Sequence, residues 1–404
     1  MQLEKVTGLT GLRFDNDLRT FPELMELYLN PVDKNRILDK KAVVTGPLSP
    51  VDMIYAAGAV AFDVNTHSTL QSIFNGHSNL SQKAVDAQIS PEISPWNLVM
   101  LGSILSGQDS ITADMFSTAF GGFDDQLIKS FQAMAKARSK PLYFWEIPRH
   151  DIESETWALN YLEQELKRLF EWLSAHTGQK ITEESLRNAI CSGNLLRRDL
   201  CEIDTYLAMK KVPIAGLEYY LVQAMLGDYA RNPEGLHKLL RQLIDELQIR
   251  VDEGKAVPGI SDTPVRIYVM GDETQELHLY NAIENYGGVV VGCDFRFSLY
   301  YNPIDENGKP LESLTRWIWN MPSNLPTKSR IKLELEYIQK QKPDAVIINS
   351  VVGSRHLPGV EKLVRYLIKQ ELNIPMLSIE TTLPGENRDK IDYQTNALLQ
   401  TIVS

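Results

Sequence analysis

The chain has 404 residues, three cysteines and a formal net charge of -11 at pH 7. This length exceeds what one hydrophobic core usually organises, so we expect two or three domains. The negative charge and the lack of a Lys/Arg run argue against nucleic acid as the main partner. No apolar stretch approaches the length of a membrane span or a secretory signal, and the cysteine usage fits a reducing compartment, so we expect a cytoplasmic protein that does not enter a membrane.

The amino-terminal 40 residues are mixed and polar, and we interpret them as a helical arm. A first α/β lobe is predicted over residues 41–150. Its expected strands are residues 41–46, 59–64 and 141–148, and its expected helices are residues 51–58, 95–105 and 124–137. Ser49 is placed to cap the first of these helices. Open α/β sheets bind ligands in loops that follow strands, and we expect such loops at residues 65–68, 93–96 and 116–124.

Residues 151–259 show helical periodicity, and Thr182 is a plausible cap because two acidic residues follow it. We interpret Gly193 as an interruption of that helix or a close contact with a neighbouring helix. The stretch over residues 252–259 resembles a linker between domains.

The C-terminal part, residues 260–404, alternates strands with helices, which favours parallel pairing. The expected strands are nearly continuous in apolar character, as a sheet covered on both faces requires; they are residues 265–270, 288–292, 344–349 and 374–379. The predicted fold class is therefore α/β, with two Rossmann-like (flavodoxin-like) parallel-sheet lobes joined by a helical segment.

Familiar motifs for cofactors are missing from the sequence. Gly271 ends a strand as in a nucleotide-binding turn, but no GxGxxG follows, and no phosphate loop, zinc helix or nucleophile elbow occurs. His67, His77 and His356 lie near expected loops, where a solvated side chain is the commoner role. Cys191 and Cys201 are ten residues apart in a helical region, which favours packing over metal binding.

The combined pattern resembles the 2-hydroxyacyl-CoA dehydratase and ATP-dependent benzoyl-CoA reductase superfamily. Residues 50–58, Pro-Val-Asp-Met-Ile-Tyr-Ala-Ala-Gly, are similar to its P-x-E-L-I-x-A-A-G motif. Three further stretches match in order and spacing: residues 177–194, residues 266–295 and residues 374–380. The resemblance extends over residues 40–404 and implies paralogous α/β subunits.

Catalytic members of that superfamily hold an iron–sulfur cluster through three cysteines, one in each of three loops. Here Ser94 stands where the first cysteine is expected. The second loop, residues 116–125, and the third, residues 350–356, contain no cysteine. A serine hydroxyl is a poor substitute for a soft thiolate at iron. We therefore expect no cofactor or metal on this chain, and a 4Fe-4S cluster on a partner subunit.

The leading hypothesis is a cluster-free subunit of a heteromeric acyl-CoA dehydratase or benzoyl-CoA reductase, which shapes the acyl-CoA cavity beside a cluster-bearing paralogue. Such a complex would take an acyl-CoA or aryl-CoA thioester and an ATP-dependent activator that donates electrons. Two alternatives stay open: a non-catalytic scaffold that kept the fold, and a cluster-free enzyme that uses acid–base chemistry on a thioester. The resemblance places the substrate between the lobes, and the candidate binding residues are Ser49, His67, Ser94, Ser117, Arg355 and His356.

Overall fold

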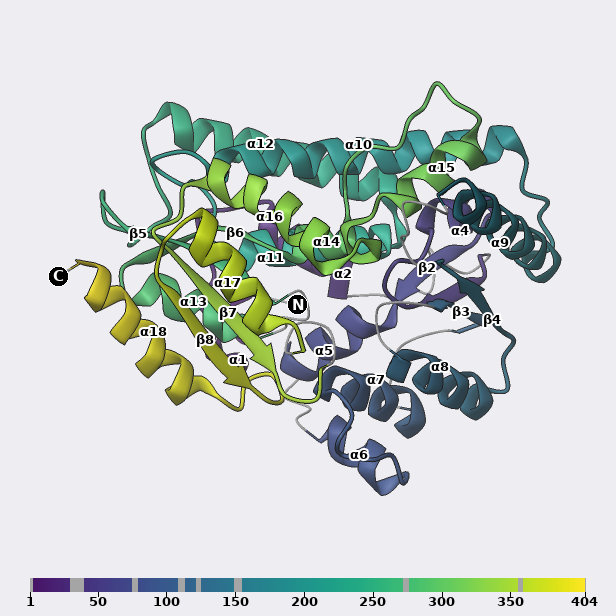
Figure 1. The fold of residues 1–404 in the computed structure, drawn as a ribbon, viewed down its shortest axis with the longest axis horizontal. Helices are drawn as coiled ribbons and strands as arrows, with labels where there is room; N and C mark the ends of the chain where they lie inside the picture. The colour runs from purple at the N-terminus through teal and green to yellow at the C-terminus, as the bar shows by residue number, and fades with distance from the viewer. Residues whose placement is uncertain are drawn as a thin grey trace.

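The computed structural model describes residues 3–29, 40–74, 79–107, 113–120, 125–148, 155–271, 276–354 and 359–403. Each lobe contains one four-stranded sheet, and the two sheets lie on opposite sides of the molecule with long helices along one edge (Figure 1). His77, Arg355 and His356 lie outside the described residues.

The first lobe has strand order β2-β1-β3-β4, and every neighbouring pair is parallel. Its strands are β1 (Ala42–Thr45), β2 (Val60–Asp63), β3 (Met115–Phe120) and β4 (Leu142–Glu146). Its helices are α4 (Val51–Ala56), α5 (Val64–Phe74), α6 (Leu80–Asp86), α7 (Pro95–Ser106) and α8 (Asp125–Arg138).

The second lobe repeats this arrangement with order β6-β5-β7-β8, again parallel throughout. Its strands are β5 (Val265–Met270), β6 (Gly288–Cys293), β7 (Ala345–Val351) and β8 (Met376–Thr381). Its helices are α13 (Leu277–Asn285), α14 (Phe295–Leu299), α15 (Pro310–Trp319), η4 (Pro322–Asn324), α16 (Thr327–Gln341), α17 (Glu361–Glu371) and α18 (Arg388–Val403). The structure thus confirms the predicted α/β fold class with two parallel-sheet lobes.

A helical segment and two N-terminal helices complete the fold. The segment consists of α9 (Glu155–Thr177), α10 (Glu183–Leu207), α11 (Gly216–Ala224), η2 (Met225–Gly227), η3 (Tyr229–Arg231) and α12 (Pro233–Asp252). The N-terminal helices are α1 (Leu3–Thr10) and α2 (Phe21–Leu29). One continuous hydrophobic cluster contains residues from both sheets, from this segment and from α2, so the lobes share a core. The opposite faces of the two sheets are covered separately, by α7 and α8 and by α16 and α17.

Three details of the predicted elements were wrong. Residues 65–68 were expected to form a loop but belong to α5, and residues 116–120 were expected to begin a loop but form most of β3. Ser49 does not cap α4: its hydroxyl donates to the carbonyl oxygen of Gly46 at 2.8 Å, and Pro50 occupies the cap position. No helix in the described ranges is long and apolar enough to cross a membrane.

Candidate functional site

Three polar residues stand in register across the carboxyl ends of the first sheet. Asp63 of β2 pairs with Thr45 of β1, and Thr45 pairs with Ser117 of β3. Residues in register on parallel strands direct their side chains to the same face, so these three side chains share one face. All three are buried. This edge is where open parallel sheets bind ligands.

Helix α5 begins directly after Asp63 and adds further buried polar side chains. We call the resulting group the polar edge. Its members are Thr45, Asp63, Asn65, His67, Ser68, Thr69 and Thr118. All of them except Asp63 have a buried side-chain nitrogen or oxygen without a hydrogen-bond partner. Buried polar groups nearly always bond to protein, ordered water or a ligand, so this concentration identifies the polar edge as the candidate recognition site.

The carboxyl group of Asp63 anchors the start of α5. It accepts hydrogen bonds from the backbone N–H of Asn65 at 3.1 Å and from the hydroxyl of Thr66 at 2.8 Å. A Cβ at Gly227 would lie 2.7 Å from Asp63 Oδ2, so only glycine permits this approach. Burial, together with the nearby carboxylate of Asp228, raises the pKa of Asp63 to about 6. Asp63 can therefore exchange a proton near neutral pH.

His67 lies in the second turn of α5 and is fully buried. Its ring packs edge-on against Phe62, with the ring centroids 4.5 Å apart. Neither ring nitrogen has a hydrogen-bond partner. Burial, and then the positive charge of Arg231, lower the pKa of His67 well below its usual value. The imidazole is therefore neutral at physiological pH and retains one donor and one acceptor.

Ser94 lies at the meeting point of the two lobes. It precedes α7 and is buried, and its hydroxyl accepts from Asn97 Nδ2 at 2.7 Å. Its backbone N–H donates to Gln126 Oε1 at 2.8 Å, and Gln126 Nε2 donates to the carbonyl oxygen of Gly353 at 3.4 Å. A Cβ at Gly353, which has a positive φ, would lie 3.3 Å from the Cα of Ser94. We call this junction the interlobe edge.

A small pocket opens at the interlobe edge. Pro95 and Trp96 of α7 form one wall, and the carboxyl ends of β7 and β8 form another. On that second wall, Asn349 Oδ1 accepts from Thr381 Oγ1 at 2.8 Å, whereas Asn349 Nδ2 is buried without a partner. The Asn349 amide therefore offers an additional hydrogen-bond donor at the pocket of the interlobe edge.

The structure brings some of the candidate residues together. Ser94 meets the loop after β7, and Ser117 lies in the register row beside Thr45. Ser49 joins the same edge less directly: its hydroxyl donates to the carbonyl oxygen of Gly46, and a Cβ at Gly46 would lie 2.4 Å from the Thr118 hydroxyl. The roles of Arg355 and His356 remain predictions, because both residues lie outside the described part of the chain.

Sequence reasoning missed much of the polar edge. The polar string from Asp63 to Thr69 at a strand end was a usable signal, but its residues 65–68 were interpreted as a loop. Asp228 and Arg231 gave no such signal. They lie far along the chain, and only the packing of η3 beside β2 brings them near Asp63 and His67.

The donor set at the expected cluster positions does not fit an iron–sulfur cluster. Ser94 and Ser117 offer hydroxyl groups, and residues 350–354 offer hydroxyl and backbone groups. The cysteines stand elsewhere: Cys191 and Cys201 lie on α10, and Cys293 ends β6, where it accepts from Gln223 Nε2 at 3.3 Å. Within the described ranges, no three His, Cys, Asp or Glu side chains form a group that could hold a metal ion.

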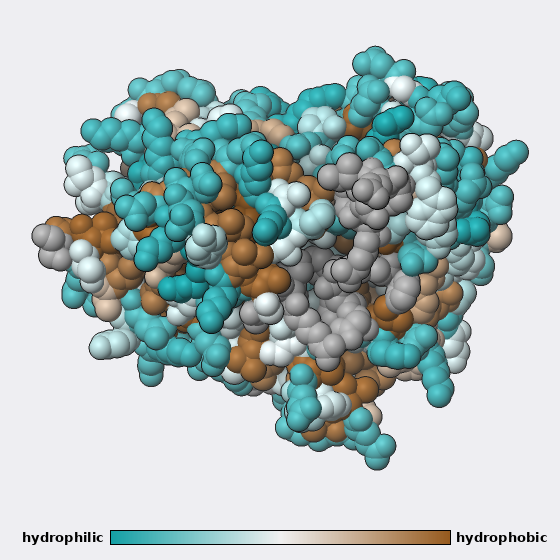
Figure 2. Space-filling view, in the orientation of Figure 1, coloured by the Kyte–Doolittle hydropathy of each residue, from teal (hydrophilic) through white to brown (hydrophobic). Residues whose placement is uncertain are grey.

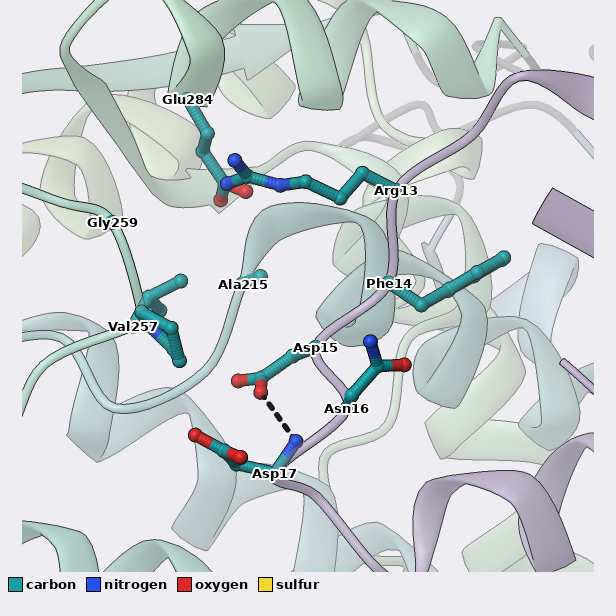
Figure 3. A pocket seen from close by; sticks show the side chains of 10 residues that line it. Arg13, Phe14, Asp15, Asn16, Asp17, Ala215, Val257, Gly259 and Glu284 are labelled. Carbon is teal, nitrogen blue, oxygen red and sulfur yellow. Dashed lines mark hydrogen bonds between the residues drawn. The ribbon is translucent and has the colours of Figure 1, made fainter. Parts of the chain in front are cut away.

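A second cavity, of about 420 Å³, lies toward the amino end of β6. Figure 3 shows the side chain of Arg13 extending toward Glu284, with Asp15 and Asp17 on the opposite side near Val257. Asp15 forms a buried ion pair with Arg250 at 2.5 Å, and its backbone N–H donates to Glu218 Oε1 at 2.5 Å. These bonds attach the N-terminal segment to the helical segment, at the edge of the sheet opposite to its carboxyl ends.

Comparison with known proteins identifies the family. The family model described as 2-hydroxyglutaryl-CoA dehydratase, D-component, matches residues 48–402. A curated protein of Escherichia coli (strain K12), "Putative dehydratase subunit YjiM", is 22% identical over 280 residues, which covers 67% of this chain and 70% of that protein. The matched range contains the second sheet, the interlobe edge, and the first sheet and polar edge except for β1 with its Thr45. The chain belongs to the 2-hydroxyglutaryl-CoA dehydratase D-component family.

Proposed function

We propose that this chain is a cluster-free subunit of a heteromeric 2-hydroxyacyl-CoA dehydratase. It binds the acyl thioester between its lobes, and a paralogous subunit carries the 4Fe-4S cluster. The proposal rests on the family match together with a donor set that has hydroxyl groups where thiolates would be needed. The electron-transfer chemistry then belongs to the partner.

The polar edge is the single observation that carries the binding role. Several buried donors and acceptors without protein partners lie at the carboxyl end of a parallel sheet and in the first turns of α5. A thioester carbonyl or a 2-hydroxyl group would satisfy them. The neutral imidazole of His67 can donate to a carbonyl oxygen, and the helix N-terminus adds a favourable dipole.

The environment around this edge also suits reactive intermediates. The side chains of the polar edge are enclosed by the shared core and by α7, which excludes bulk water. Asp63 has a pKa of about 6, so it can hold or release a proton beside the bound acyl group. In this proposal the chain orients the substrate, keeps water away and manages a proton.

An exposed apolar surface supports a protein partner. Figure 2 shows hydrophobic side chains reaching the surface over α17 and around α6 and α7 on one face, whereas hydrophilic residues mostly cover α10 and α12. Val352, directly after β7, is 46% exposed, and Tyr366 on α17 is 60% exposed. A paralogous subunit docked on this face would cover these side chains and close the region between the lobes.

Calorimetric titration with a panel of CoA thioesters tests the proposal. The panel contains 2-hydroxyacyl, enoyl and aryl thioesters, and the protein is used alone and with its cysteine-bearing paralogue. We expect 2-hydroxyacyl-CoA to bind, and Arg355→Ala to weaken binding by about 1.5–3 kcal/mol if the guanidinium makes a charged hydrogen bond. This corresponds to a rise in Kd of roughly ten-fold or more.

Lys129→Ala is the matched control, because Lys129 is an exposed cation on α8. Its Kd should equal that of the wild type. Equal affinity in Arg355→Ala would remove that residue from the site. Preference for aryl thioesters would favour ring reduction over dehydration. No binding by the wild type, with or without the paralogue, would favour the non-catalytic scaffold.

A further inference from the structure

The η3 turn has an unusual backbone. Tyr229, Ala230 and Arg231 have φ values of 55°, 44° and 62°, so three consecutive non-glycine residues adopt the left-handed region. Such residues are uncommon and persist only where the surrounding structure holds them. Here the Asp228 carboxylate holds the turn: it accepts from the backbone N–H of Ala230 at 2.8 Å and from Arg231 Nη1 at 2.6 Å. Asp228 is fully buried.

The same turn positions the Arg231 guanidinium against the C-terminal end of α2. Its Nη2 donates to the carbonyl oxygen of Tyr28 at 2.6 Å and to that of Leu27 at 3.3 Å, at the C-terminal end of α2. Those carbonyl groups lack helical partners and carry partial negative charge, so a guanidinium suits them. The guanidinium carbon lies 5.2 Å from the centroid of the Phe62 ring.

Phe62 links this cation to the polar edge. The His67 ring contacts the same phenyl ring, with centroids 4.5 Å apart and planes at 71°. The Phe62 ring therefore contacts both the Arg231 guanidinium and the His67 imidazole. Charged and titratable groups surround this region: Asp63 ends β2, Asp228 directly precedes η3, and Arg231 ends η3. Tyr28 of α2 packs against the Arg231 guanidinium. A positive charge on His67 would be buried and would lie near the positive charge of Arg231.

We propose that Arg231 is a positioning residue that fixes the Phe62 ring on which His67 packs, and that its charge adds to burial in disfavouring a cation at His67. His67 then meets a ligand as a hydrogen-bonding group and not as a cation, which favours an uncharged carbonyl or hydroxyl group over a phosphate or carboxylate. Only this last consequence rests on the proposed function. The state of the imidazole is a property of the chain alone, and it can be tested without any ligand.

Nuclear magnetic resonance of isotope-labelled histidine in the full chain tests the inference. The sequence has seven histidines, so His67→Gln assigns the His67 resonances. Wild type and variants are titrated between pH 4.5 and 8.5. We expect His67 to stay neutral from pH 6 to 8 in the wild type and in Arg231→Lys, which keeps the charge. Arg231→Met should shift the His67 midpoint upward and weaken the magnetisation transfer between the His67 and Phe62 rings.

Arg241→Met is the control, because Arg241 is a partly exposed arginine of α12 paired with Asp199 and Glu202. It should leave the His67 signals unchanged. If Arg231→Met does not fold, Asp228→Asn serves, because it removes the counter-charge of Arg231 and should move the His67 midpoint further down. The proposal would be overturned if the His67 signals were identical in the wild type and in a folded Arg231→Met. It would also be overturned if Asp228→Asn left the His67 midpoint unchanged or moved it to higher pH. Thioester binding can fail independently of either result.

Discussion

Two buried glutamates beside the N-terminal segment have raised pKa values and so keep their protons at higher pH than an exposed glutamate does. Burial raises the pKa of Glu218 to about 7, and the Asp15 carboxylate adds to that shift. Burial raises the pKa of Glu284 to about 8, and the Glu218 carboxylate adds to it. Glu218 Oε1 accepts from the Asp15 backbone, and Glu284 Oε1 accepts from Gly216 N at 2.7 Å. An unfolded glutamate titrates near pH 4.3. Between that value and pH 8 the folded chain therefore holds more protons than the unfolded chain.

This difference predicts how stability depends on pH. Because the native state binds the extra protons, the contribution of Glu284 is fully present below the unfolded pKa and is lost as pH rises toward 8, with a slope of at most about 1.4 kcal/mol per pH unit. Glu284→Gln keeps an acceptor for Gly216 but cannot ionise. We expect the variant to match the wild type in urea unfolding at pH 5 and to be more stable at pH 8.5.

Glu371→Gln is the control for that comparison, since Glu371 is exposed at the end of α17. It should follow the wild type at both pH values. Parallel stability curves for wild type and Glu284→Gln would show that Glu284 titrates alike in the folded and unfolded chains. Effects of other titrating groups cancel, because every comparison is made between variants at the same pH.

At the scale of elements, a buried ion pair joins α4 to α10. Arg197 Nη2 donates to Asp52 Oδ2 at 2.6 Å, and the Tyr229 hydroxyl donates to Asp52 Oδ1 at 3.1 Å. The Arg197 guanidinium also lies 4.8 Å from the Trp317 ring centroid. Breaking a buried pair leaves an uncompensated charge, so this contact has a large effect on stability. Through Asp52 it also fixes the helix that follows Ser49.

Gly193 makes this ion pair possible, which gives a prediction. A Cβ there would lie 2.5 Å from Asp52 Oδ1 and 2.6 Å from both Arg197 Nη1 and the Tyr229 hydroxyl. Alanine would gain about 1 kcal/mol in helix propensity, but displacing the pair costs about 3–5 kcal/mol. We expect Gly193→Ala to lower the free energy of unfolding by several kcal/mol, as measured by urea denaturation.

Gly8→Ala tests the propensity term alone, because nothing lies within 4 Å of a Cβ at that position in α1. That variant should be neutral or slightly more stable. If Gly193→Ala behaves like Gly8→Ala, the ion pair can shift without cost, and Gly193 does not act as the close-contact glycine between helices.

Particular elements show what local sequence could predict. Thr182 caps α10 as expected, since its hydroxyl accepts from Ser185 N at 3.0 Å and the Ser185 hydroxyl accepts from Thr182 N at 2.9 Å. The apolar strands of the second lobe were also predictable, because a sheet covered on both faces needs continuous apolar runs. Strand β3 was missed, because its sequence Met-Phe-Ser-Thr-Ala-Phe interrupts the apolar pattern.

The same cause hid part of the candidate site. Ser117 and Thr118 lie inside β3, and Asn65 and His67 lie in α5; all four are polar while fully or almost fully buried. Sequence patterns equate polarity with exposure, and that rule fails where buried polar groups serve a ligand. Contacts between segments far apart in sequence, such as Arg231 with Phe62, could not be predicted without the fold.

For the whole molecule, the repeated strand order has a consequence for assembly. Both sheets have the same order and are joined by one shared core, so the two carboxyl edges keep a fixed relation through Gln126, Ser94 and Gly353. Without cluster ligands at this junction, the chain has no redox centre of its own in the proposed function. A complete enzyme then needs a second subunit that supplies the thiolates.

This requirement predicts the metal content of the isolated chain and of the complex. The chain expressed alone and reconstituted anaerobically should be colourless and contain no stoichiometric iron or zinc, because Ser94 stands at the first expected ligand position, the other two loops contain no cysteine, and hydroxyl oxygen binds soft iron poorly. When it is mixed with a cysteine-bearing paralogue, gel filtration should show one complex, and iron analysis of the separated chains should find the iron with the paralogue.

Two cysteine variants serve as controls for the metal analysis. Cys293 is the most buried thiol, and Cys201 is the matched control because it is partly exposed on α10. A stoichiometric cluster on the isolated chain that is lost in Cys293→Ala but kept in Cys201→Ala would contradict the cluster-free assignment, and a stable monomer in both gel-filtration runs would contradict the paired subunit.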